Sequence, residues 1–168
     1  MKKATWGAGV VAAGVALLAS PASAQTVLTT APLNVSVTVG NQARITLTGS
    51  VDFADADPDV FPTLTATPLD VQARARVAPA TTVNLTVMGG ASHFDPATNT
   101  IPVANLTWTS TGTGFTANGT MSDAAQQSVG SWTGPGAHSG TQTYSLVNSW
   151  AYAPGSHGMT LTYTLSTP

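Results

Sequence analysis

The stretch Met159-Thr160-Leu161-Thr162-Tyr163-Thr164-Leu165 alternates large apolar side chains with threonine. Successive side chains of a β-strand point to opposite faces, so a period of two predicts a strand with one buried and one solvated face. Threonine suits the solvated face because its branched Cβ favours extended backbone and its hydroxyl bonds to water. We therefore expect a β-strand close to Pro168.

The same alternation recurs along the rest of the chain. It is present in Leu33–Val39, at Ile45 and Leu47, in Val71–Val77 and in Val83–Val87. Weaker strand candidates are Leu106–Thr109, Phe115–Met121, Gln142–Leu146 and Trp150–Tyr152. Turn-forming Gly, Pro and Asn separate these runs, and no segment after the first 24 residues has the pattern of an amphipathic helix. The pattern predicts an all-β fold, an immunoglobulin-like β-sandwich of about eight to ten strands, with a closed barrel as the alternative.

The first residues have the pattern of a removable leader. Lys2 and Lys3 precede an uncharged apolar run, Trp6–Leu18, and small residues follow at Ala22 and Ala24. This pattern predicts a signal peptide at residues 1–24 and one domain at residues 25–168. The apolar run is shorter than the ~20 residues of a membrane span, and no later segment resembles one. We expect a secreted or cell-surface protein, with the periplasm as an alternative.

The composition excludes several functions. Charged residues make up 7% of the chain, against about 25% in typical globular proteins, whereas threonine occurs 28 times. Both lysines lie in the predicted leader, so residues 25–168 contain three arginines and seven aspartates, a net charge of −4. So few cations argue against nucleic-acid binding and against a polybasic membrane patch. The chain has no cysteine, which excludes disulfides and a cysteine-linked lipid anchor.

An acidic run is the candidate metal site. Four of the seven aspartates lie between Asp52 and Asp59, and Asp55, Asp57 and Asp59 occupy alternate positions. Clustered carboxylates are the ligands that Ca²⁺ prefers, so these three residues predict a calcium site, the only cofactor expected. The run lacks the Gly and the Glu of an EF-hand loop. The alternative is an acidic turn whose side chains cap backbone amides.

The remaining titratable residues predict no enzyme. After the leader the chain contains no Cys, Glu or Lys, so its acids and bases are seven Asp and three His, with no catalytic motif among them. His93 and Asp95 would share one face of a strand, which is half of a zinc site. The alternative is a polar loop surface.

Trp132 is the candidate ligand-binding aromatic. It is flanked by Gly130, Ser131 and Gly134, which predicts an exposed ring able to stack on a sugar. By contrast, Trp108 would share a strand face with Leu106 and so belong to the core. A carbohydrate- or cell-wall-binding module, stabilised by calcium and recognising a glycan, is therefore the alternative function.

The closing stretch Gly158–Pro168 resembles the last strand of WxL-type cell-surface domains, with Tyr163-Thr164-Leu165 where that family has Trp-x-Leu before a terminal Pro. The leader, size and strand-rich makeup also resemble spore-coat-U-like and pilin-like subunits. These resemblances imply an extracellular, non-enzymatic subunit that assembles through strand exchange. No functional residue is carried over from these families.

The first hypothesis is therefore an exported structural or adhesive protein that pairs with itself or with other surface subunits. Either terminal strand is suited to completing a neighbouring sheet, because no Lys or Glu follows the predicted leader to protect an edge. The side chains expected to make these contacts are Val35, Val37, Val39, Leu161, Tyr163 and Leu165.

Overall fold

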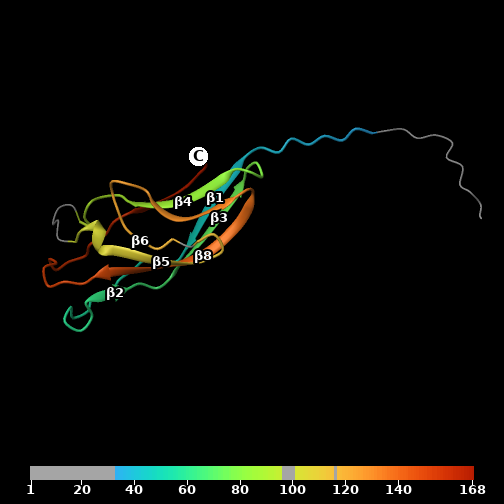
Figure 1. Ribbon diagram of the computed structural model, residues 1–168. Helices are drawn as coiled ribbons and strands as arrows, with labels where there is room; N and C mark the ends of the chain where they lie inside the picture. Colours follow the sequence, from blue (N-terminus) through green and yellow to red (C-terminus); the bar gives the residue numbers. More distant parts are fainter. Residues whose placement is uncertain (1–32, 96–100, 116) are drawn as a thin grey trace, which may run out of the picture. The chain divides into compact units, whose positions relative to one another are not determined.

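The computed structural model describes residues 33–95, 101–115 and 117–168 (Figure 1). The predicted signal peptide, residues 1–24, lies outside the described residues. The chain divides into two units, Met1–Val37 and Thr38–Pro168, each described by itself. The strands named below all belong to the second unit.

Nine strands and one short 3-10 helix make up the described part of the second unit. The first sheet contains β1 (Gln42–Thr48), β2 (Thr63–Thr65), β3 (Leu69–Arg76), β5 (Leu106–Gly112), β6 (Gly119–Thr120) and β8 (Gly136–Val147). The second sheet contains β4 (Thr82–Gly89), β7 (Gln127–Thr133) and β9 (Leu161–Ser166). The 3-10 helix η1 (Val103–Asn105) precedes β5, and the described ranges contain no α-helix.

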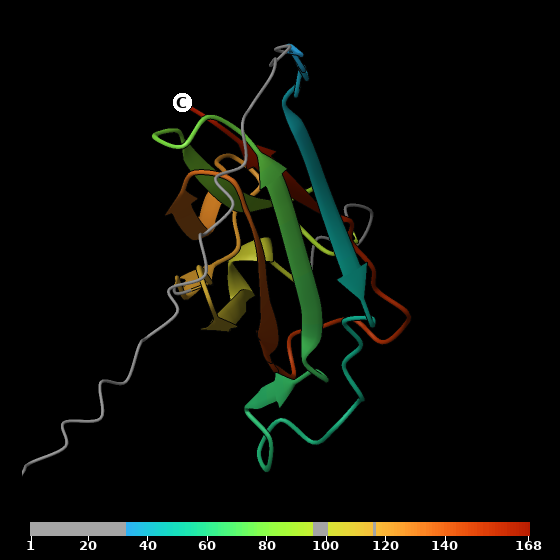
Figure 2. The same cartoon turned by 90° about the vertical axis from the view of Figure 1, so that its right-hand side faces the viewer.

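All of the strand pairs are antiparallel. The first sheet has the order β1-β3-β8-β5-β6, with β2 also paired to β8, and the second has the order β7-β4-β9. Figure 2 shows the long arrows of β1 (blue-green) and β3 (green) running side by side in opposite directions. The two sheets pack against each other, which confirms the predicted all-β sandwich.

The burial of the strands follows the alternation in the sequence. In β3, Val71, Ala73 and Ala75 are buried, whereas the residues between them are exposed. In β4, Val83, Leu85 and Val87 are fully buried in the same way. The predictions of a strand at Val71–Val77 and at Val83–Val87 are therefore confirmed, although Val77 lies one residue beyond the end of β3.

The core lies between the two sheets. Its largest side chains are those of Trp108, Tyr144 and Phe115, each no more than 2% exposed. Trp108 and Tyr144 are opposite one another in the β5–β8 register, and the Trp108 Nε1–H donates to the backbone oxygen of Ala117 (3.1 Å). The prediction that Trp108 and Leu106 are core residues is confirmed.

The prediction of a strand at Leu33–Val39 is wrong for this structure. None of these residues is in a strand, and Leu33, Val35, Val37 and Val39 are exposed by 86, 86, 84 and 61%. Alternation indicates which face of a strand would be buried, but a strand also needs a neighbour to accept its backbone hydrogen bonds. β1, which begins at Gln42, takes the position beside β3 instead.

Other boundaries also differ from the prediction. Trp150–Tyr152 forms a turn, and among the described residues of Phe115–Met121 only the two of β6 are in a strand. The Gly- and Ser-containing β7 was not predicted, because it has few apolar residues to reveal an alternation. β8 is longer than the predicted Gln142–Leu146, because polar residues continue its ladder with β3.

Candidate functional site

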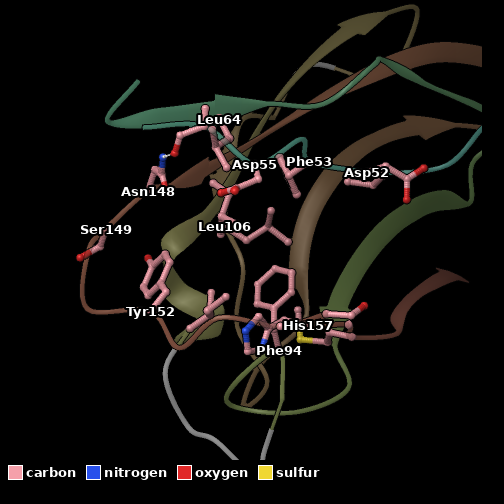
Figure 3. Close-up of a pocket in the computed structure, with 18 of the residues that line it drawn as sticks. Asp52, Phe53, Asp55, Leu64, Phe94, Leu106, Asn148, Ser149, Tyr152 and His157 are labelled. Atoms are coloured by element: carbon pink, nitrogen blue, oxygen red, sulfur yellow. Dashed lines mark hydrogen bonds between the residues drawn. The ribbon is translucent and has the colours of Figure 1, made fainter. Parts of the chain in front are cut away.

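A cavity of about 1330 Å³ opens among three loops of the second unit. These loops follow β1, β4 and β8, whose last residues meet at the same end of the antiparallel sandwich. Figure 3 shows Phe53, Leu64 and Leu106 gathered around the same space as Phe94 and Tyr152. The position is typical of a ligand site on a β-sandwich, because loops vary in sequence while the sheets hold them.

The strands contribute apolar side chains to the cavity. Both sheets contribute to it, the first through Leu64, Leu106 and Leu146 and the second through Leu161. The polar and charged side chains of the lining come mainly from the β1–β2 and β8–β9 loops. The described lining residues include no Lys or Arg, and His157 is the basic side chain among them.

The loop between β8 and β9 is held by side-chain hydrogen bonds. The Tyr152 hydroxyl donates to the Val147 oxygen (2.8 Å) and accepts from Asn105 Nδ2 (2.7 Å). A ring nitrogen of His157, Nε2, bonds to the Ala153 oxygen (2.8 Å). Its other nitrogen, Nδ1, lies 4.0 Å from Asp95 Oδ2. The structure thus brings Asp95 to His157, whereas the sequence pattern had joined it with His93.

The three aspartates of the predicted calcium site are not gathered into a metal site. Among the described residues, no group of three or more His, Asp or Glu side chains is arranged to hold a metal ion. Asp57 instead accepts the backbone N–H of Asp59 through Oδ1 (2.9 Å), and Asp59 Oδ1 accepts the Trp150 Nε1–H (3.2 Å). Asp57 thus caps a backbone amide of its own turn, as the alternative of an acidic turn predicts.

Trp132 is half-buried, so the prediction of an exposed ring is wrong. It packs against the core, and its ring centroid lies 4.3 Å from that of His138. The two residues lie on either side of the bend at Gly134 and Pro135, where the chain passes from β7 of the second sheet to β8 of the first. The exposed tryptophan is Trp150, which is 71% exposed and lines the cavity. Its neighbours Asn148 and Ser149 are the turn-forming residues that could have revealed it.

The last strand, β9, is half-buried at Leu161, Tyr163 and Leu165. It pairs with β4 along one side, and no strand of the described ranges pairs with its other side. A second, smaller cavity of about 290 Å³ lies between β9 and β1, with Ala43 and Leu165 among its lining residues. The prediction of a C-terminal strand is confirmed, although Met159 lies just before it.

No protein-family model matches the chain, and no curated protein is significantly similar to it. None of the helices in the described ranges has the length and apolarity needed to cross a membrane.

Proposed function

We propose that the protein is an exported, non-enzymatic structural or adhesive subunit that joins a neighbouring subunit by pairing of β-strands. The observation that carries the proposal is the exposure of the apolar segment before β1. Leu33, Val35 and Val37 are each exposed by more than 80% and belong to no strand. Such an apolar surface is normally covered by a partner.

The segment has the composition of a donated strand. Its apolar residues share one face of an extended chain, while Asn34, Ser36 and Thr38 share the other. Backbone hydrogen bonds would provide affinity in such an addition, and pockets for the alternate apolar side chains would provide register.

The unpaired edge of β9 supports the proposal as well, because it is an edge that could receive the strand donated by a neighbouring copy. Leu161, Tyr163 and Leu165 leave part of their side chains exposed beside this edge, and β1 lies next to it in the opposite sheet. Neither Lys nor Glu occurs in the described residues to discourage pairing. An added strand would cover these side chains and bond to the free backbone groups of β9.

Size-exclusion chromatography with light scattering, and electron microscopy of the product, test the proposal on the chain from residue 25 onward. Val35→Asp combined with Val37→Asp should abolish association, because the charges would enter an apolar groove. The matched control, Asn34→Asp with Ser36→Asp, adds the same charge on the opposite face and should leave association unchanged. A strict monomer before any substitution, or equal effects of both pairs, would contradict the proposal.

A carbohydrate- or cell-wall-binding module is the second candidate, and the exposed ring of Trp150 beside the large cavity favours it. Exposed aromatic rings stack on sugars, and Asp59 fixes the edge of this ring. A glycan array should then give a hit that is lost in Trp150→Ala and kept in Val60→Ala, a neighbouring exposed apolar residue. The absence of any hit, or a hit that Trp150→Ala leaves unchanged, would contradict this second candidate.

A further inference from the structure

All three arginines of the described residues lie on one outer surface of the first sheet. Arg44 of β1 and Arg74 of β3 are directly opposite in the strand register, so their side chains share a face. Arg76 lies two residues beyond Arg74 and therefore points to the same side. All three side chains are exposed. We name these residues the arginine patch.

The arginine patch is unfavourable in an isolated subunit. Like charges directly opposite each other on neighbouring strands are destabilising. In the described ranges no arginine forms an ion pair. A charged residue can protect an open sheet edge, which explains Arg44 on the edge strand β1. It does not explain Arg74 and Arg76, because β3 is an inner strand between β1 and β8. The patch therefore has the charge of a surface that meets an acidic partner.

The chain itself contains an acidic surface at the opposite end of β1. Asp52, Asp55, Asp57 and Asp59 follow the last residue of β1 and are all exposed. Arg44, in contrast, lies near the first residue of this strand, and Arg74 and Arg76 lie beside that same end. Positive and negative charge are thus separated along the sandwich, which favours contacts between opposite ends of two copies.

We propose that subunits associate head to tail, with the arginine patch of one copy against the Asp52–Asp59 loop of the next. This inference rests on the proposed function and names its partner, a second copy of the chain. The exposed segment of residues 33–39 continues into the arginine end of β1. A strand donated from this end would bring the two charged surfaces of neighbouring copies together. Repetition of such a heterologous contact gives a filament or a ring.

Charge reversal followed by mixing tests the inference. The double variant Arg44→Asp with Arg74→Asp should weaken self-association about ten-fold or more. The double variant Asp55→Arg with Asp57→Arg should have the same effect, because in each case charges of the same sign then face each other across the interface. Mixing the two variants should restore association, since the reversed surfaces complement each other again. The control Asp123→Arg, an exposed residue outside both surfaces, should leave association unchanged. Failure of the mixture to associate would overturn the inference.

Two further measurements separate the outcomes. Association of the unsubstituted chain should weaken as salt is raised, because exposed charges are screened. If Val35→Asp with Val37→Asp abolishes association but the charge reversals do not, strand pairing stands and the head-to-tail contact is wrong. If the Arg44 and Arg74 reversal removes binding to heparin but leaves association intact, the arginine patch is a polyanion site and the inference is also wrong. Circular dichroism of each variant confirms that the sandwich is retained.

Discussion

The hydroxyl oxygens of Tyr144 and Tyr163 lie 2.6 Å apart and connect the two sheets through the core. Tyr144 belongs to β8 of the first sheet and Tyr163 to β9 of the second. The Tyr163 hydroxyl donates in turn to Oε1 of Gln142, which is fully buried. Nε2 of this glutamine donates to Ser110 Oγ at the longer distance of 3.4 Å. The tyrosine pair thus satisfies a polar side chain in an otherwise apolar core.

Removing one hydroxyl from this network should destabilise the fold. In Tyr163→Phe the buried Gln142 oxygen loses its donor, and an unsatisfied buried polar group costs about 1–3 kcal/mol. Urea denaturation measures the loss, and Thr162→Ala on the exposed face of β9 serves as the control, with an expected change of about 0.5 kcal/mol or less. Adding Gln142→Leu to Tyr163→Phe should recover part of the stability, since the orphaned group is then absent. A neutral Tyr163→Phe would show that water replaces the hydroxyl.

Stability should fall in alkaline solution because of the same pair. Burial raises the pKa of Tyr163 from 10.0 to about 12. Burial raises the pKa of Tyr144 even more, and the neighbouring Tyr163 contributes to that increase. Tyrosines of the unfolded chain lose protons first, so the stabilisation is fully present below about pH 10 and is lost as the pH rises toward the folded pKa. Melting temperature measured against pH should be flat near pH 8–9, about one unit or more below the tyrosine pKa of about 10 in the unfolded chain, and should decline above pH 10. The decline should be shallower in Tyr144→Phe with Tyr163→Phe.

A methyl group at Gly130 should disrupt the edge of the second sheet. A Cβ built there would lie 1.7 Å from the backbone oxygen of Gly114, and the Gly130 backbone cannot move away freely because β7 is paired with β4. We expect Gly130→Ala to destabilise by about 1–3 kcal/mol or more, as overpacking does. Gly158→Ala is the control, because its Cβ would meet open space. Equal melting temperatures of the two variants would contradict this packing.

Truncation of Trp132 should cost more stability than truncation of Trp150. Trp132→Ala should lower stability by about 3 kcal/mol or less, since this ring is half-buried against His138 and full burial gives about 3–5 kcal/mol. Trp150→Ala should change the stability by about 0.5 kcal/mol or less, because the ring is 71% exposed. This figure leaves out the contribution of the hydrogen bond to Asp59. Thermal unfolding of both variants measures the difference. The reverse order would restore Trp132 as the exposed aromatic.

Strict alternation predicted β3 and β4, but it also predicted a strand at Leu33–Val39 that the structure does not form. The β3 and β4 predictions succeed because Val71, Ala73, Val83 and Leu85 mark one face unambiguously. β7 was missed because glycine and serine carry no such signal, although its backbone pairs equally well with β4. The calcium prediction from Asp55 and its neighbours required a loop conformation that spacing alone does not determine.

By itself, the sequence determined the all-β class, the strand near Pro168 and the scarcity of charge, because these depend on local periodicity and composition. Tertiary structure alone decided that Leu33–Val39 lies outside the sheets, that Trp132 is covered and that Arg44 faces Arg74. These facts depend on which distant segments become neighbours. Backbone pairing partners and the covering of one side chain by another are long-range relations, and a period of two in the chain carries no information about them.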